Sequence, residues 1–323
     1  MLLVGLKFCL ALSVSMDTNG TLPREHEHLG LFRMTRKTRR YCTVRNVKLT
    51  RTPRTRVQSP WSLQRLNDDS SFLLCIGSAR LIIDPWLTGP EIDGFSLFNT
   101  AEHTSECVQP KDIGGRIDGI LVSLPFSDHC HEITLSMFPA AVPIYACSGA
   151  ARRIRQDHRL AHRRVIELSA SPTQIGCSGV FVRAIPTSGI LDFTHSGLVI
   201  EDSSRRVVYS PHGLHLSGGT SHFLAALPMK TCICLMVTCS EYSPPLILGG
   251  KVNLGFEAAL KVINAIDARS ILDIHSEKKN TIGLIPLVSS SSYLTNAELK
   301  AKLKDISDIT VLSSDSKIVL HLS

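Results

Sequence analysis

DGILVSLPFSDHCH, residues 118–131, is the stretch that decides the fold prediction. Its first seven residues form a short apolar run that ends in polar residues, which is typical of a strand buried at the centre of a sheet. Asp128, His129 and His131 follow this run within a few residues.

Runs rich in β-forming residues lie on both sides of this stretch. Ser71–Ile76 and Arg80–Asp84 are separated by Gly77-Ser78 and predict a hairpin. Further strands are expected at residues 142–146, 165–168, 180–185, 196–201, 206–210, 231–238 and 270–275 and near the C-terminus, with helices at residues 133–138, 150–156, 216–226, 254–266 and 295–304. This order favours a layered α/β sandwich. A Rossmann fold is disfavoured because no GxGxxG motif opens a helix after the first strand, and the sequence contains no Walker motif.

The positive charge of the chain is concentrated at its start. The formal net charge is +7, but residues 1–58 carry 12 basic and 3 acidic residues, whereas the remaining 265 residues carry 23 and 25. The predicted folded part is therefore near neutral, which argues against a nucleic-acid-binding surface. No apolar run approaches the roughly 18–20 residues that a membrane-spanning helix needs, so we expect no integral membrane segment.

Residues 33–58 are rich in Arg and Thr and contain no acidic residue, which is the composition of an organelle transit peptide. Together with the signal-like apolar start at residues 1–15, this stretch resembles the two-part leader of proteins imported into plastids. We therefore predict a disordered basic leader over residues 1–58, a plastid location, and a folded domain over residues 59–323. The alternatives are mitochondrial import, a disordered tail without a targeting role, and a cytoplasmic protein whose leader is an artefact of the gene model.

Three segments together resemble the metallo-β-lactamase superfamily. SFLLCIGSARLIIDPW (71–86) matches its opening hairpin, LVSLPFSDHCH (121–131) falls where a strand delivers the HxHxDH loop, and VVYSPHGLH (207–215) falls where a strand usually ends in Gly-Asp. The resemblance covers about residues 66–320 and extends to a cyanobacterial and plant-plastid branch of the superfamily. It implies an α/β fold of four layers, an αββα sandwich.

The metal-binding motif that the resemblance implies is degenerate in this chain. Leu124 and Phe126 stand at two of its His positions, and IPTS at residues 185–188 contains no third His. His212 or Gly213 stands where the bridging Asp is expected, depending on a shift of one residue. A standard centre with two zinc ions therefore cannot be assembled from these residues.

The remaining residues still imply a site for one ion, zinc or another divalent metal, and no other cofactor. By resemblance, Asp128, His129 and His275 are metal ligands, and His212 is a ligand or a general base. Asp128 and His212 are the candidate catalytic residues. Asp84, His131 and His215 are the candidates for residues that support the ligands from behind.

The leading hypothesis is a metal-dependent hydrolase with an altered, mononuclear site that acts on an unknown small-molecule substrate. The alternative is a non-catalytic binding or scaffold protein that has kept the fold and lost the metal. A third hypothesis is a thiol-dependent enzyme that uses Cys130, which lies between two histidines in the sequence. The sequence leaves the oligomeric state open.

Overall fold

A computed structural model of the protein describes residues 60–187, 194–304, 309–312 and 319–322. The predicted leader at residues 1–58 lies outside the described residues, and so does Ser188 at the end of the IPTS stretch. No helix within the described ranges is both long enough and apolar enough to cross a membrane.

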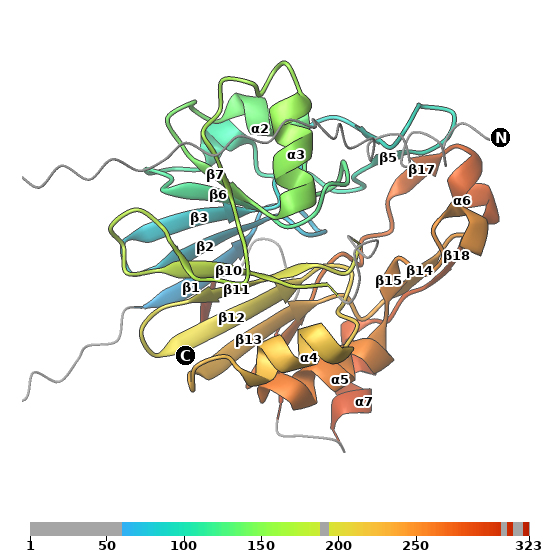
Figure 1. Ribbon diagram of the computed structural model, residues 1–323. Helices are drawn as coiled ribbons and strands as arrows, with labels where there is room; N and C mark the ends of the chain where they lie inside the picture. Colours follow the sequence, from blue (N-terminus) through green and yellow to red (C-terminus); the bar gives the residue numbers. More distant parts are fainter. Residues whose placement is uncertain (1–59, 188–193, 305–308, 313–318, 323) are drawn as a thin grey trace, which may run out of the picture. The chain divides into compact units, whose positions relative to one another are not determined.

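The first large sheet contains the predicted hairpin and the predicted central strand. Its strand order is β20-β1-β2-β3-β6-β7-β8 (Figure 1). The strands are β1 (Trp61–Arg65), β2 (Phe72–Ile76), β3 (Ala79–Ile83), β6 (Gly119–Val122), β7 (Ile144–Ala146), β8 (Val165–Glu167) and β20 (Val319–Leu322). Strands β1, β2 and β3 pair antiparallel, whereas β3, β6, β7 and β8 pair parallel. The carboxyl ends of β3 and β6 therefore lie at the same edge of the sheet.

The second large sheet has the strand order β19-β16-β13-β12-β11-β10-β9. The strands are β9 (Thr173–Gln174), β10 (Phe181–Ile185), β11 (Gly197–Glu201), β12 (Arg205–Ser210), β13 (Thr231–Val237), β16 (Ser270–Asp273) and β19 (Thr310–Val311). Strands β12, β13 and β16 pair parallel, so their carboxyl ends also share one edge.

Helices cover the outer face of each large sheet. Against the first sheet lie α2 (Glu132–Met137) and α3 (Ser148–Gln156), and against the second lie α4 (Gly218–Ala225), α5 (Phe256–Ile266) and α7 (Asn296–Leu303) (Figure 1). The two sheets face each other between these helix layers (Figure 1). The predicted α/β fold with four layers, αββα, is confirmed.

Alternation along the strands explains why their sequences are apolar at nearly every position. In β3, Leu81 and Ile83 point into the core between the two sheets, whereas Ile82 packs with the helices on the outer face. In β12, Val207 points into the same inner core and Val208 packs against the helices of the second sheet. Because successive side chains point to opposite faces, a strand covered on both sides must be apolar on both.

Within the described residues, two three-stranded sheets and three short helices supplement the large sheets and were not predicted. Their elements are β4 (Glu91–Ile92), β5 (Thr100–Glu102), β17 (Asn280–Ile282), β14 (Glu241–Ser243), β15 (Asn253–Leu254), β18 (Ser290–Ser292), α6 (Leu284–Val288), η2 (Pro110–Asp112) and η3 (Leu246–Leu248). The sheet orders are β17-β5-β4 and β15-β14-β18. Strands of two or three residues are too short to show a period in sequence, which is why they were missed.

Candidate metal centre

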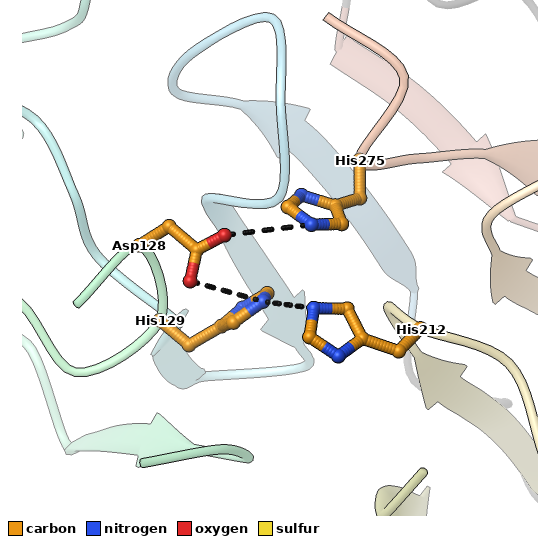
Figure 2. Close-up of side chains that lie close together, drawn as sticks. All are labelled: Asp128, His129, His212 and His275. Atoms are coloured by element: carbon orange, nitrogen blue, oxygen red, sulfur yellow. Dashed lines mark hydrogen bonds and ion pairs between the residues drawn. The ribbon is translucent and has the colours of Figure 1, made fainter. Parts of the chain in front are cut away.

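Four polar side chains meet at the carboxyl ends of the parallel strands. Asp128 and His129 follow β6, His212 follows β12, and His275 follows β16. One ligand atom from each residue lies within 4.8 Å of those of the other three (Figure 2). We call Asp128, His129, His212 and His275 the four-ligand cluster. Carboxyl ends of parallel strands are a common position for binding sites in α/β folds.

The cluster is compact and almost entirely buried. The Nε2 atoms of His129 and His212 are 3.1 Å apart. Asp128 places Oδ1 3.5 Å from Nε2 of His129 and Oδ2 3.4 Å from Nε2 of His275 (Figure 2). Ligands that lie about 2.0–2.2 Å from one tetrahedral ion are about 3.3–3.6 Å from one another, which is close to the spacing found here.

An oxygen acceptor holds the opposite ring nitrogen of each histidine. Each Nδ1 donates one hydrogen bond, from His129 to Asp84 at 2.9 Å, from His275 to Asp69 at 2.9 Å and from His212 to the carbonyl oxygen of Thr194 at 3.1 Å. Because carboxylate and carbonyl oxygens only accept, Nδ1 carries the hydrogen in every ring and Nε2 faces the cluster. Hydrogen bonds of this kind orient metal-binding histidines.

Asp84 supports His129 from the end of β3. Besides the ring of His129, its carboxylate accepts the backbone N–H of Ser123 at 2.7 Å and the hydroxyl of Tyr209 at 2.7 Å. Its backbone has φ 41°, a left-handed conformation that few residues other than glycine adopt. The position of Asp84 agrees with the supporting role that the resemblance implies, and the role itself stays a prediction.

Asp69 and Lys279 complete the surroundings, and neither was predicted from the sequence. Asp69 is fully buried in the turn between β1 and β2, where it binds His275 and also accepts from Nζ of Lys279 at 3.0 Å. The same Nζ lies 3.5 Å from Oδ2 of Asp128 and 5.0 Å from the ring centroid of Trp86. Lys279 thus contacts both Asp128, a candidate metal ligand, and Asp69, which orients the candidate ligand His275.

Without an ion, the cluster holds a proton on His129. Burial lowers the pKa of His129, but the carboxylates of Asp128 and Asp84 outweigh burial and raise it to about 9. Burial and the neighbouring charges of His129 and His275 lower the pKa of His212 well below its usual value. His129 therefore donates through Nε2 to the neutral ring of His212, and this proton supplies a positive charge at the centre of the cluster.

The residues fit a divalent cation. Oδ1 of Asp128 is buried and accepts no hydrogen bond within the described part of the chain. Burial raises the pKa of Asp128, but the charges of His129, Lys279 and His275 outweigh burial and hold it below its usual value. A buried, ionised oxygen without a donor is costly. A cation relieves that cost, and imidazole with carboxylate is a donor set that zinc and other divalent metals accept.

The structure places two further candidates apart from the ligand atoms of the cluster. His131 caps α2, where its Nδ1 accepts the backbone N–H of Thr134 at 3.3 Å. His215 is exposed and packs edge-to-face on His195, with ring centroids 4.4 Å apart. Neither His131 nor His215 supplies an atom to the four-ligand cluster.

Apolar residues occupy the positions where the resemblance places two histidines. Leu124 is fully buried, and the ring of Phe126 lies 5.5 Å from the ring of His212. Cys130 is also fully buried, and burial raises the pKa of its thiol above the usual value. Because a reactive cysteine needs an accessible thiolate, the structure gives no support to the thiol-dependent hypothesis.

A sequence model described as beta-lactamase superfamily domain matches residues 79–276, which include all four residues of the cluster. The chain belongs to the beta-lactamase superfamily. The metallo-β-lactamase fold predicted from three short segments is thereby confirmed. No curated protein sequence matches the chain.

Several solved structures are similar to this chain over most of its length. Igni18, a metallo hydrolase from Ignicoccus hospitalis, is 14% identical with a TM-score of 0.58, over 82% of this chain and 99% of that one. A possible metal-dependent hydrolase from Veillonella parvula is 13% identical with a TM-score of 0.58, over 82% and 100%. CmlA, a diiron β-hydroxylase from Streptomyces venezuelae, is 14% identical with a TM-score of 0.57, over 82% and 54%. The TM-scores establish a shared fold, and at identities this low they establish the fold alone.

Proposed function

We propose that this protein is a metal-dependent hydrolase that binds one divalent ion in the four-ligand cluster and acts on a small molecule. The observation that carries the proposal is the buried Oδ1 of Asp128, which accepts no hydrogen bond from the described residues and lies beside the Nε2 atoms of three oriented histidines. The described similarity to Igni18 and to the Veillonella parvula protein supports hydrolysis as the reaction class.

Each residue has a defined task in this proposal. His129 and His275 bind the ion through Nε2, because Asp84 and Asp69 hold their Nδ1 atoms. Asp128 binds through Oδ1. A divalent ion at such a site polarises a substrate oxygen and lowers the pKa of water toward neutrality. His212, which has a neutral ring, is a fourth ligand or accepts the proton of the attacking water at Nε2.

The site is altered from the full superfamily motif in this proposal. Leu124 and Phe126 supply no ligand atoms, and the ring of Phe126 lies 5.5 Å from the ring of His212. The loss of these two ligands favours a mononuclear site. We further propose that residues 1–58 direct the protein to a plastid; a fluorescent fusion of this segment that stays in the cytosol would contradict that assignment.

The test is hydrolysis by the full-length protein with a panel of chromogenic esters, lactones and phosphodiesters. We expect at least one substrate to be turned over, activity to be lost after treatment with a chelator, and activity to return when a divalent metal is added. His129→Ala should be inactive under every condition. His222→Ala, which removes an exposed histidine on α4, is the matched control and should retain full activity.

A second candidate function is a non-catalytic binding protein. It is favoured because two expected ligand positions hold apolar residues, Leu124, which is buried, and Phe126, which packs near His212. In this case the cluster retains its proton and stabilises the loop after β6 instead of binding metal. The two candidates differ in the chelator experiment, because a binding protein without metal shows no chelator-sensitive hydrolysis and no change in stability when metal is added.

A further inference from the structure

Lys279 places a positive charge inside a shell of carboxylates around the four-ligand cluster. Its side chain is 12% exposed and its Nζ lies 3.0 Å from Asp69 and 3.5 Å from Asp128. Asp69 binds His275, which is a candidate metal ligand, and Asp128 is itself a candidate metal ligand in the cluster. An ammonium group at this position interacts with any cation that binds there.

The carboxylates that contact the cluster histidines or Lys279 balance the charges of Lys279 and one divalent ion. Asp69, Asp84 and Asp128 are three carboxylates in direct contact with the cluster histidines or with Lys279. One ammonium and one divalent ion together supply three positive charges, which equal the charges of these carboxylates. A second divalent ion would leave a net positive charge in a buried site, where uncompensated charge is costly.

Two further acids lie one layer outside this group. Glu91 and Asp93 both lie within hydrogen-bond distance of the hydroxyl of Ser127, at 3.0 Å and 2.7 Å. Burial and the nearby charge of Asp128 raise the pKa of Glu91 to about 8, and burial also raises that of Asp93. These two acids contact Ser127, whereas the three inner carboxylates contact the cluster histidines or Lys279 directly, so the inner three dominate the charge next to the ion site.

We propose that Lys279 is a fixed counter-charge that limits the cluster to one divalent ion and weakens its affinity for that ion. The inference rests on the proposed function only in requiring that the cluster binds metal. Lys279 is not a ligand in this account. Its ammonium stabilises the ionised carboxylates of Asp69 and Asp128 in the metal-free protein. When an ion binds, the ammonium repels it, and this repulsion is stronger in the buried site than it would be in water.

Removal of the positive charge of Lys279 should increase the affinity of the cluster for a metal ion. In Lys279→Met the stem is replaced by an apolar chain of similar length, and the repulsion is lost. We expect Zn²⁺ to bind at least about tenfold more tightly, because even screened charges a few ångströms apart interact by more than a kcal/mol. Lys279→Arg retains the charge and should bind Zn²⁺ with about the affinity of the wild type.

The experiment is a calorimetric titration of the full-length, chelator-treated protein with Zn²⁺. Lys278→Met is the matched control, because Lys278 is the exposed neighbour of Lys279 in sequence and packs on Tyr293. Circular dichroism and thermal unfolding establish that each variant is folded. If Lys279→Met does not fold, Lys279→Gln removes the charge and keeps a hydrogen-bond donor for Asp69.

The possible results separate this inference from the proposed function. One Zn²⁺ per wild-type chain, with tighter binding in Lys279→Met or Lys279→Gln alone, supports both. One Zn²⁺ per wild-type chain, with unchanged or weaker binding in a folded, neutral variant, overturns the role of Lys279 and leaves the metal site standing. Equal tightening in Lys279→Arg also overturns it, because the charge is then not the cause. No Zn²⁺ binding by the wild type overturns both.

Discussion

Oδ1 of Asp69 lies 2.9 Å from Nδ1 of His275, although the two residues are 206 positions apart in the sequence. Asp69 lies in a turn of the first sheet, and His275 follows the last long strand of the second. This hydrogen bond therefore crosses between the two sheets at the edge where their carboxyl strand ends meet. The backbone of His275 is left-handed, with φ 54°, so a specific main-chain conformation accompanies the bond.

Replacement of Asp69 should weaken metal binding without removing a ligand. In Asp69→Asn the amide is a weaker acceptor for His275 than the carboxylate, and it cannot balance the charge of Lys279. Loss of such an outer hydrogen bond typically costs 10–100-fold in metal affinity, and we expect a loss of about that size for Zn²⁺. Asp68→Asn is the control, because the side chain of Asp68 is only partly buried. Equal affinities of Asp69→Asn and the wild type would contradict the orienting role.

Metal affinity should rise with pH through the neutral range. The raised pKa of His129, about 9, means that an ion must displace a proton at every pH below this value. Affinity should therefore fall by roughly tenfold for each pH unit below about 9. Calorimetry in buffers with different ionisation enthalpies measures the displaced protons directly. We expect about one proton per ion at pH 7.5, and release of none would show that His129 is neutral before the ion binds.

Tyr209 should stabilise the fold through its hydrogen bond to Asp84. Its replacement removes no residue of the four-ligand cluster. Tyr209→Phe keeps the ring in the core and removes the 2.7 Å hydrogen bond to the buried carboxylate. Because hydrogen bonds to charged groups are worth about 1.5–3 kcal/mol, the free energy of unfolding should decrease by about that amount. Urea unfolding of the apoprotein measures it, with the partly exposed Tyr293→Phe as control. A decrease no larger than that of the control would refute the assignment.

The cysteines should react in the order of their exposure. Cys177 is exposed, whereas Cys130 is fully buried and burial raises the pKa of its thiol. Brief treatment of the native protein with iodoacetamide, followed by peptide mass mapping, should therefore label Cys177 and leave Cys130 unmodified. Labelling of Cys130 ahead of Cys177 would revive a thiol-dependent mechanism.

The layers of the fold could be predicted because each one has a local signature. The hairpin at Gly77 shows the expected turn, with φ 60°, and the apolar runs became strands buried on both faces. Helix and strand ends differ from the predictions by only a few residues, as for α5, which begins at Phe256 and not at residue 254. Strand β1 was not assigned, although the burial of its residues alternates, because five residues give a weak periodic signal.

The site could be predicted only in part, because its outer contacts join distant parts of the chain. Asp128, His129, His212 and His275 were all predicted from the resemblance, and the structure brings the four together. Asp69 was missed, since NDDSS at residues 67–71 reads as an ordinary polar turn and only folding shows that it is buried. Sequence likewise gave no sign that Lys279 faces inward.

The metal content of the purified full-length protein, determined by elemental mass spectrometry beside His129→Ala and His222→Ala, is the most direct test. We expect about one divalent metal ion per chain in the wild type and in His222→Ala, and almost none in His129→Ala. Absence of metal from all three proteins, even after reconstitution with zinc, iron or manganese, would show that Asp128, His129, His212 and His275 do not form a metal site.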